Sequence, residues 1–284
     1  MAARGAAAQR LMLTDYHTHL RPDVSDTPPE RYFTEENVRR YLDAANARGI
    51  EELGFSEHVY RFRESLAIWQ HEFWRACAFD SLDEYVDFLT RMPVKVGLEV
   101  DWIPGREEEI ARLIGDRPWD YIIGSVHFIG DRGIDHDGYD IWLSATPDEV
   151  WTAYFETLGD AAASGLFDIL AHPDLVKVWG KAKPDPPRPK REYYELALDQ
   201  IAAADVAVEV STAGLRKAAG ELYPARELLE MFVAAGKPVS LSSDAHEPET
   251  IGHAYDQALE LMRECGVDSV SVFENRKRRE VPLG

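Results

Sequence analysis

Short apolar runs alternate with longer amphipathic segments along almost the whole of this 284-residue chain. The apolar runs have the length and composition of buried strands, and most of them are separated by segments with helical periodicity. Strands that alternate with helices indicate a parallel β/α architecture, in which each helix returns the chain to the same end of the sheet. The expected strands are residues 11–16, 52–56, 94–100, 121–126, 167–171, 206–210, 238–242 and 269–273.

The helical segments carry start and stop signals. Residues 34–48 repeat apolar side chains at helical spacing and end before Gly49, which favours termination. Residues 147–164 follow Thr146, a good N-cap, and begin with Pro147, whose fixed φ suits a first helical position. Two further helices are expected over residues 224–235 and 248–265.

The number of alternating units favours a barrel over an open sheet. The chain contains neither the glycine pattern that binds dinucleotides nor the one that cradles phosphate in P-loop proteins. Two segments interrupt the alternation: residues 128–143 are rich in Gly and Asp, and residues 177–191 are rich in Pro and Lys. Loops that follow strands build the active face of a barrel, so we expect these segments to act as a lid or to contact substrate. The alternative is a pair of plain surface loops.

The charge balance limits what the protein can bind. The chain has 31 Lys and Arg against 51 Asp and Glu, a formal net charge of −20. Such a surface repels nucleic acid and anionic membranes, so we expect neither as a partner and predict a small-molecule substrate instead. For an anionic substrate, positive potential must be supplied locally, by metal ions or by a few Arg and Lys side chains.

The cysteines and the N-terminus predict a cytoplasmic location. Cys77 and Cys265 lie far apart in the sequence and fit a reducing compartment. Arginines interrupt the apolar run at the N-terminus, which therefore lacks the continuous core of a signal peptide. No apolar stretch approaches the length of a transmembrane helix. We expect residues 1–10 to be a disordered tail and residues 11–284 to form a single domain.

Histidines and carboxylates recur directly after the expected strands. In a parallel barrel these strand ends converge on one face. Groups of like type gathered there are electrostatically costly unless a cation joins them, and imidazole and carboxylate both bind borderline divalent metals. The pattern therefore predicts a multinuclear metal site. Its candidate members are His17, His19, His58, Glu99, His127, His172, Asp244 and His246.

The remaining histidines are interpreted as packed or surface residues. His71 lies in an aromatic segment and His136 in the Asp-rich segment 128–143. We place His253 in the helix expected over residues 248–265. A single histidine without companions is more often structural than a metal ligand.

Seven segments together resemble one family. The segments DYHTH, FSEH, GLEVD, IIGSVHF, ILAHPDL, EVSTAGLRK and SLSSDAH, spread from Asp15 to about Gly266, are similar to the polymerase-and-histidinol-phosphatase (PHP) superfamily. GSVHF, HPDL, STAGLRK and SDAHEPETIG bring the chain closer to its histidinol-phosphate phosphatase branch. The resemblance implies a distorted, TIM-like (β/α)7 barrel that holds two to three divalent metal ions, of Zn, Fe or Mn. It also implies hydrolysis of L-histidinol phosphate in histidine biosynthesis.

The resemblance also implies how the metal ligands are shared. A first metal takes His17, His19, Glu99 and Asp244. A second shares Glu99 as a bridge and adds His127 and His172. A third takes His58 and His246 together with an early acid, for which Asp23 is preferred and Asp26 is the alternative.

The expected mechanism uses the metals to make a nucleophile. Two neighbouring metal ions lower the pKa of a water between them, and the resulting hydroxide attacks phosphorus. Arg216 and Lys177 are the candidate cations for the phosphoryl oxygens. Arg216 is preferred because its planar guanidinium group can donate hydrogen bonds to two oxygens at once. A solvated loop lysine is an equal alternative for Lys177. The leaving alkoxide needs a proton, for which Asp244 is the first candidate and His246 the second.

Residues beside the ligands are expected to recognise the rest of the substrate. Histidinol phosphate carries an imidazole and an ammonium group, which acidic or aromatic side chains would select. Location alone recommends Glu57, Tyr60, Phe128 and Asp135 for this part. Glu57 is alternatively an acid that orients a metal ligand.

Two rival interpretations remain. A PHP-type phosphoesterase could act on another small phosphate monoester or on a nucleotide with the same metal ligands. A non-enzymatic metal-binding domain could also keep the fold. Metal content measured together with turnover of a generic aryl phosphate separates the second rival from an enzyme.

Overall fold

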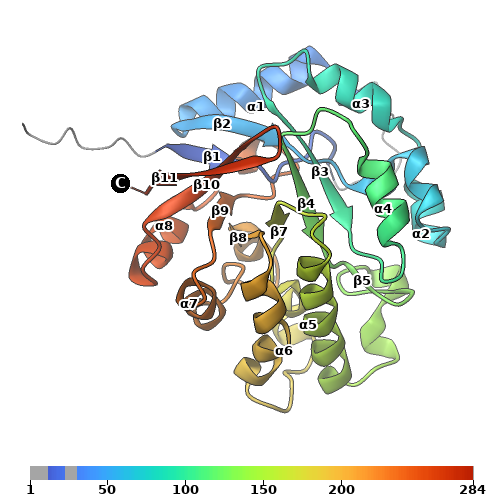
Figure 1. The fold of residues 1–284 in the computed structure, drawn as a ribbon, viewed down its shortest axis with the longest axis vertical. Helices are drawn as coiled ribbons and strands as arrows, with labels where there is room; N and C mark the ends of the chain where they lie inside the picture. Colours follow the sequence, from blue (N-terminus) through green and yellow to red (C-terminus); the bar gives the residue numbers. More distant parts are fainter. Residues whose placement is uncertain (1–11, 23–30, 284) are drawn as a thin grey trace, which may run out of the picture.

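The computed structural model of the protein describes residues 12–22 and 31–283 (Figure 1). The tail expected over residues 1–10 lies outside the described residues. The helices that the model describes include none that is both long enough and apolar enough to cross a membrane.

Seven strands form one parallel sheet in the order β1-β2-β3-β4-β7-β8-β9. They are β1 (Leu13–Asp15), β2 (Ile50–Phe55), β3 (Lys95–Asp101), β4 (Tyr121–Ser125), β7 (Ile169–Leu170), β8 (Ala207–Ser211) and β9 (Val239–Ser242). The chain segments that follow β1 and β9 come together, because Thr18 bridges with Ala245 and the His19 N–H donates to the Ala245 carbonyl at 2.8 Å. The sheet is therefore a nearly closed barrel, which confirms the predicted fold class.

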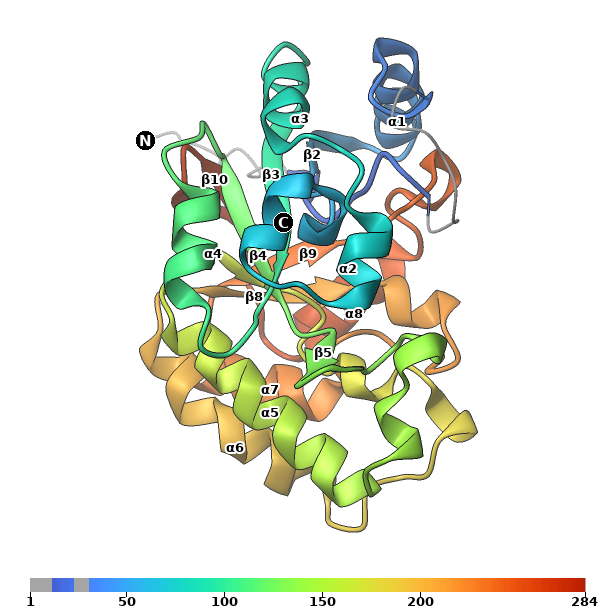
Figure 2. The same ribbon diagram turned by 90° about the vertical axis from the view of Figure 1, so that its right-hand side faces the viewer.

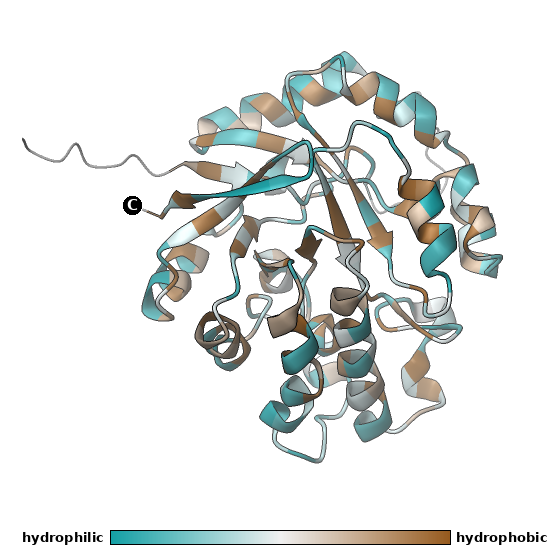
Figure 3. Ribbon diagram, in the orientation of Figure 1, coloured by the Kyte–Doolittle hydropathy of each residue, from teal (hydrophilic) through white to brown (hydrophobic). Residues whose placement is uncertain are grey.

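The helices lie outside the strands (Figures 1 and 2). They are α1 (Glu35–Ala47), α2 (Glu72–Cys77), α3 (Leu82–Leu89), α4 (Glu107–Ile114), α5 (Pro147–Ala163), α6 (Lys190–Ala203), α7 (Arg226–Ala234) and α8 (Tyr255–Glu264). Their hydrophobic residues form stripes beside polar ones, whereas strands β4 and β7 are hydrophobic throughout much of their length (Figure 3). This is the pattern of helices that bury one face against a central sheet.

The first turn of α5 shows how the sequence sets a helix boundary. The Thr146 hydroxyl accepts a hydrogen bond from the Glu149 N–H at 3.3 Å, and the Glu149 carboxylate accepts one from the Thr146 N–H at 2.8 Å. This reciprocal capping box satisfies two backbone donors that have no partner within the helix. Pro147 occupies the first turn, as predicted. Helix α5 then packs along α6 (Figure 2).

The eighth expected strand is not part of the barrel, which corrects the sequence interpretation. β10 (Ser269–Glu274) pairs antiparallel with β11 (Lys277–Pro282). The two residues between them, Asn275 and Arg276, have φ of 51° and 58°. Positive φ at both positions makes the tight turn that joins antiparallel strands, so the chain reverses at once and no crossover helix follows.

Side chains fill the barrel interior. The Tyr121 ring lies against Gly54 and Gly97, where an added Cβ would overlap it, and the Tyr121 hydroxyl donates to the Tyr16 carbonyl at 2.5 Å. Phe273 of the β10–β11 hairpin packs on Tyr16 and Tyr121. The hairpin therefore closes the end of the barrel opposite the carboxyl ends of the strands.

The helix expected over residues 248–265 begins later than predicted. Pro248–Thr250 is a single 3-10 turn, and the α-helix starts only at Tyr255. Between them, Gly252 and Ala254 have φ of 60° and 55°, which an α-helix cannot contain. His253 consequently lies in this turn and not in a helix, contrary to the prediction.

Candidate metal centre and its cavity

The predicted ligands converge at the carboxyl ends of the strands, around Glu99 at the end of β3. One oxygen of Glu99 lies 3.3 Å from His17 Nε2 and 2.5 Å from His58 Nδ1. Its other oxygen lies 3.5 Å from His127 Nε2 and 3.3 Å from His172 Nε2. A single buried carboxylate is thus surrounded by imidazoles that come from four different strand ends.

The donor atoms fall into overlapping groups within which all atoms lie within 4.8 Å of one another. The groups are His17, His19 and Glu99; His17, His172 and Asp244; Glu99, His127 and His172; and His19, His58 and His246. The structure therefore brings together all the predicted ligands that it describes. Asp23 and Asp26, the alternatives for the early acid, lie outside the described residues.

The donor set fits divalent metal ions. Among the described residues, His17 Nε2, His19 Nε2, His58 Nδ1, Glu99 Oε2 and Asp244 Oδ1 are buried and have no hydrogen-bond partner. Buried polar atoms without partners are costly and therefore rare in proteins. Imidazole nitrogens and carboxylate oxygens that point at one another across 3 to 4 Å are satisfied together when a cation lies between them.

The electrostatics of the cluster show opposing effects of burial and charge. Burial by itself would raise the pKa of Glu99, but the charges of His58, His17 and His127 hold it well below its usual range. Burial would lower the pKa of His127, yet the carboxylates of Asp101 and Glu99 raise it to about 10. For His58, the effect of burial exceeds that of the Glu99 charge and lowers the pKa to about 3. The pKa values of the imidazoles around Glu99 are therefore shifted in opposite directions.

Carboxylates behind the ligands fix their orientation. Asp101 Oδ1 lies 2.7 Å from His127 Nδ1, which leaves Nε2 of that ring directed at Glu99. Glu209 on β8 does the same for His17, at 2.8 Å from Nδ1. Partners of this kind set the tautomer of a ligating histidine and raise its basicity. Glu209 was not singled out from the sequence, since no histidine accompanies it at the end of β8.

A third carboxylate, Glu57, organises the segment after β1. One of its oxygens accepts hydrogen bonds from the backbone N–H groups of Leu20 and Arg21, at 2.6 and 3.0 Å, and the other lies 2.8 Å from Arg61 Nη1. Burial would raise the pKa of Glu57, but the Arg61 charge and the His19 ring lower it to about 2. This geometry fits an acid that orients neighbouring groups, one of the two roles expected for it.

Two of the candidate ligands have strained backbones. His172 and Asp244 have φ of 26° and 51°, in the region that non-glycine residues rarely adopt. Asp15 supports the second of them, because its carboxylate accepts hydrogen bonds from the Ser243 N–H at 2.9 Å and the Gly252 N–H at 3.1 Å. Strain that surrounding contacts maintain is typical of functional sites.

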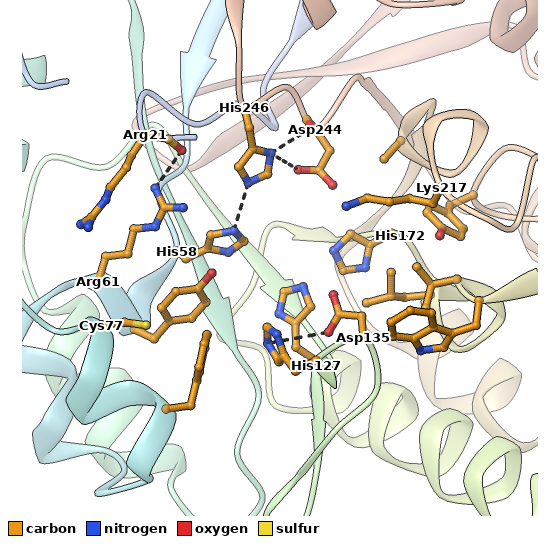
Figure 4. Close-up of a pocket in the computed structure, with 18 of the residues that line it drawn as sticks. Arg21, His58, Arg61, Cys77, His127, Asp135, His172, Lys217, Asp244 and His246 are labelled. Carbon is orange, nitrogen blue, oxygen red and sulfur yellow. Dashed lines mark hydrogen bonds and ion pairs between the residues drawn. The ribbon is translucent and has the colours of Figure 1, made fainter. Parts of the chain in front are cut away.

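Five of the candidate ligands line a cavity of about 510 Å³, namely His58, His127, His172, Asp244 and His246 (Figure 4). Figure 4 shows Arg21 and Arg61 on one side of this cavity, and Lys217 and Asp135 on the other, beside His172. Apolar side chains complete the lining; they are Leu175, Val178, Trp179, Ala213, Ala218, Phe73 and Ala76. A cavity with metal donors, cations and an apolar wall suits a small phosphorylated molecule with a partly apolar body.

The two irregular segments form one wall of this cavity. Segment 128–143 contains a short hairpin of β5 (Phe128–Ile129) and β6 (Arg132–Gly133). Segment 177–191 contacts it through Trp179, whose indole N–H donates to the Ile134 carbonyl at 2.7 Å. Lys183 of the same segment pairs with Asp140. Residues of both segments line the cavity, which matches the predicted contact with substrate better than the alternative of plain surface loops.

The two predicted phosphate-binding cations lie just outside the cavity lining. The Arg216 guanidinium donates to the carbonyls of Ser243 and Asp244, at 2.7 and 2.9 Å, and its Nη1 has no partner among the described residues. The Lys177 ammonium is buried, 2.8 Å from the Asp174 carboxylate, and donates to a backbone carbonyl. Lys217 lines the cavity instead, although the sequence drew attention to its neighbour Arg216.

The histidines interpreted as structural divide into two kinds. His71 caps α2 by accepting a hydrogen bond from the Phe73 N–H at 3.2 Å, which fits the prediction. His136 packs against Phe73, which fits the expectation of a packed residue, but it also lines the cavity beside Asp135, which the sequence did not indicate. Its position depends on the fold of segment 128–143, which has no periodic sequence signal.

Comparison with known proteins agrees with the geometry. Residues 32–213 match the PHP domain family. The chain is 34% identical over 248 residues to the "Probable histidinol-phosphatase" of Deinococcus radiodurans. This alignment covers 84% of this chain and 91% of that protein. It is 26% identical over 262 residues to the histidinol-phosphatase of Bacillus subtilis. That alignment covers 82% of this chain and 96% of the relative.

A solved structure shows the same fold. The crystal structure of histidinol phosphate phosphatase from Lactococcus lactis, complexed with Zn, L-histidinol and phosphate, superposes with a TM-score of 0.73 at 24% identity. The superposition covers 95% of this chain and 100% of that one. With the barrel, the metal-donor cluster and these matches, the chain belongs to the PHP domain family.

Proposed function

We propose that this protein is a histidinol-phosphatase, a hydrolase that releases phosphate from L-histidinol phosphate in histidine biosynthesis. The observation that carries the proposal is the group of buried imidazoles and carboxylates around Glu99, open to a cavity that is lined by both charged and apolar side chains. The relatives named above are similar to this chain over most of its length, and they support the choice of substrate.

The donor groups suit two to three divalent metal ions, and Zn, Fe or Mn fits their chemistry. We assign His17, His19, Glu99 and Asp244 to the first, and Glu99, His127 and His172 to the second. His58 and His246 would hold the third, with Asp23 or Asp26. Such ions, when bound, lower the pKa of a bound water and neutralise phosphoryl oxygens.

Asp244 is the residue that we assign to hold a proton during ester cleavage. It lies at the edge of the donor cluster, with Oδ1 3.4 Å from His19 Nε2, and it also lines the cavity. Burial would raise the pKa of Asp244, but the charge of His17 and the hydrogen bond from His19 hold it well below its usual range. The carboxylate is therefore ionised, and its low basicity suits a group that passes a proton on to the leaving alkoxide rather than one that retains it. His246, 3.6 Å away, is the second candidate.

The phosphoryl oxygens need cations that can approach them. Lys217 has no carboxylate within 4.0 Å among the described residues and lines the cavity, so we add it to Arg216 as a phosphate-binding candidate. Arg216 has one guanidinium nitrogen without a partner in the described part of the chain. Lys177 stays a candidate from the sequence, although it must leave its ion pair with Asp174 to reach phosphate.

The apolar wall gives the organic part of the substrate a place to bind. Trp179, Val178 and Leu175 line the cavity together with Tyr60 and Phe73. The Tyr60 ring stacks on His58 at 4.7 Å and contacts Phe73 at 4.9 Å. Flat side chains of this kind bind a flat heteroaromatic ring such as imidazole through their faces and edges.

The test is a comparison of phosphate release from L-histidinol phosphate, an aryl phosphate and nucleoside monophosphates. We expect kcat/KM for L-histidinol phosphate to exceed the others by at least about 10²-fold, which corresponds to about 2.7 kcal/mol of transition-state discrimination. A chelator should remove the activity, and added metal should restore it. Equal, slow cleavage of every ester would reject the substrate, and bound metal without any turnover would indicate a non-enzymatic domain.

The cytoplasm stays our predicted location. The structure leaves Cys77 and Cys265 as free thiols, which fits a reducing compartment.

A further inference from the structure

Asp135 is a carboxylate in the cavity that lacks a hydrogen-bond donor. It lines the cavity, and its Oδ1 is buried without a hydrogen-bond partner among the described residues. Among the described residues, its carboxylate has an ion-pair distance below 4.0 Å only to the neighbouring His136, whose Nε2 lies 3.7 Å away and is itself without a hydrogen bond. An ionised carboxylate in such a place gains strongly from a cation that a ligand brings to it.

The backbone that precedes Asp135 is fixed by hydrogen bonds through both its N–H and its carbonyl group. The preceding residue, Ile134, donates its N–H to the carbonyl of the metal ligand His127 at 2.8 Å. The Ile134 carbonyl accepts hydrogen bonds from the indoles of Trp142 and Trp179, at 3.3 and 2.7 Å. These bonds tie the backbone beside Asp135 to His127 and to both segments of the cavity wall, so the Cα from which its side chain enters the cavity is placed before a ligand binds.

Among the described residues that line the cavity, Arg and Lys side chains outnumber carboxylates. Among the described residues of the lining, the carboxylates are Asp135 and the metal-binding candidate Asp244. Arg21, Arg61 and Lys217 supply positive charge, which suits a phosphate. A substrate that also carries an ammonium group close to its phosphate finds one carboxylate not already assigned to metal, namely Asp135.

We propose that Asp135 is a specificity-determining residue, which binds the ammonium group of L-histidinol phosphate. This inference rests on the proposed function. In that substrate the carbon that bears the ammonium group is bonded directly to the carbon of the phosphoester, so an ammonium partner must lie beside the metal ligands. Figure 4 shows Asp135 there, next to His127 and His172.

The experiment compares two substrates on two enzymes. The substrates are L-histidinol phosphate and 3-(imidazol-4-yl)propyl phosphate, which lacks only the amino group. The enzymes are the parent protein and Asp135→Asn, which keeps the side-chain shape. We expect kcat/KM for L-histidinol phosphate to fall about 30- to 100-fold in the variant, because a buried charge pair is lost, while kcat/KM for the amino-free substrate changes by less than about threefold.

Asp131→Asn is the matched control, since Asp131 belongs to the same loop but its side chain is 80% exposed. It removes the same charge outside the cavity, so it should leave both substrates unaffected. Metal content is measured on every variant. An equal loss on both substrates, or a loss of metal in Asp135→Asn, would overturn the inference and assign Asp135 to the metal site or to general catalysis.

The substrate proposal and this inference fail in different ways. If the parent protein does not hydrolyse L-histidinol phosphate, the proposed function falls. If the parent hydrolyses it and Asp135→Asn does so equally well, only the assignment of Asp135 falls. Asp135→Glu should recover part of the preference for the amino substrate, because it restores the charge at a slightly different distance.

Discussion

The carboxylate of Glu209 holds His17 and His172 together: Oε1 lies 2.8 Å from the His17 ring and Oε2 accepts the His172 N–H at 2.6 Å. Oε1 also accepts a hydrogen bond from Ser242 at 2.5 Å. One side chain on β8 therefore orients a ring from the end of β1 and the backbone of a ligand that follows β7. The sixth barrel strand contributes none of the candidate ligands but positions two of them.

Glu209→Gln should weaken metal binding. The amide keeps the shape of the side chain but loses the charge that favours the ligating form of His17, and the loss of such a partner costs about 10- to 100-fold in metal affinity. Competition with a chromogenic chelator measures the effect. Glu274→Gln, at a side chain that is 75% exposed, is the control and should bind metal as the parent does. Equal affinity in both variants would show that Glu209 has no such role.

Removal of metal should destabilise the fold as well as stop the reaction. The unpaired atoms of His17, His19 and Glu99 are then left without the cation that joins them. A ligand at about 1,000 times its Kd stabilises a protein by about 4.1 kcal/mol, so we expect Tm to fall by several degrees on chelation and to recover when metal is added. A Tm that chelation does not change would contradict a metal site in this cluster.

Gly97→Ala should destabilise the barrel. An added Cβ would overlap the buried Tyr121 ring, which also holds Tyr16 through a hydrogen bond, so the ring cannot move away freely. Overpacking of this kind costs about 1–3 kcal/mol of unfolding free energy. Gly138→Ala is the control, because a Cβ there meets open space. Chemical denaturation measures both, and equal stability of the two variants would show that the barrel interior adapts.

Lys217 and Lys177 should respond differently to substitution by Met. Lys217→Met removes a cavity cation and should raise KM about tenfold without changing Tm, the effect of about 1.4 kcal/mol of lost binding. Lys177→Met leaves the buried Asp174 without its partner and should cost about 3–5 kcal/mol of stability, with KM unchanged in the folded fraction. A raised KM in Lys177→Met would instead support Lys177 as a substrate ligand.

Much of the barrel could be predicted because strands and helices have regular periods. Each of the first seven expected strands overlaps an observed barrel strand to within a few residues. The departures come from single turns. The positive φ of Asn275 and Arg276 turns the eighth strand into a hairpin, and Ala254 delays the start of α8. Such backbone conformations are decided by a few residues and leave no periodic pattern.

The ligands could be predicted for a different reason: they follow the strands directly, so the fold alone brings them to one face. Glu57 is adjacent to the candidate ligand His58 and was noticed for that reason. Glu209, Lys217 and His136 became visible only in three dimensions, since the direction of each side chain depends on a strand register or a loop conformation. Chain position predicts the cluster well, but it does not predict which cation faces the cavity.

The packing of Tyr16, Tyr121 and Phe273 has a consequence for molecular traffic. Among the described residues, these side chains fill the barrel axis and the β10–β11 hairpin covers its far end, so the products cannot leave along the axis. The alcohol and the phosphate must both leave on the side of the barrel where the next substrate enters. A product that has not yet dissociated therefore occupies the path of the next substrate, and we expect high product concentration to slow turnover.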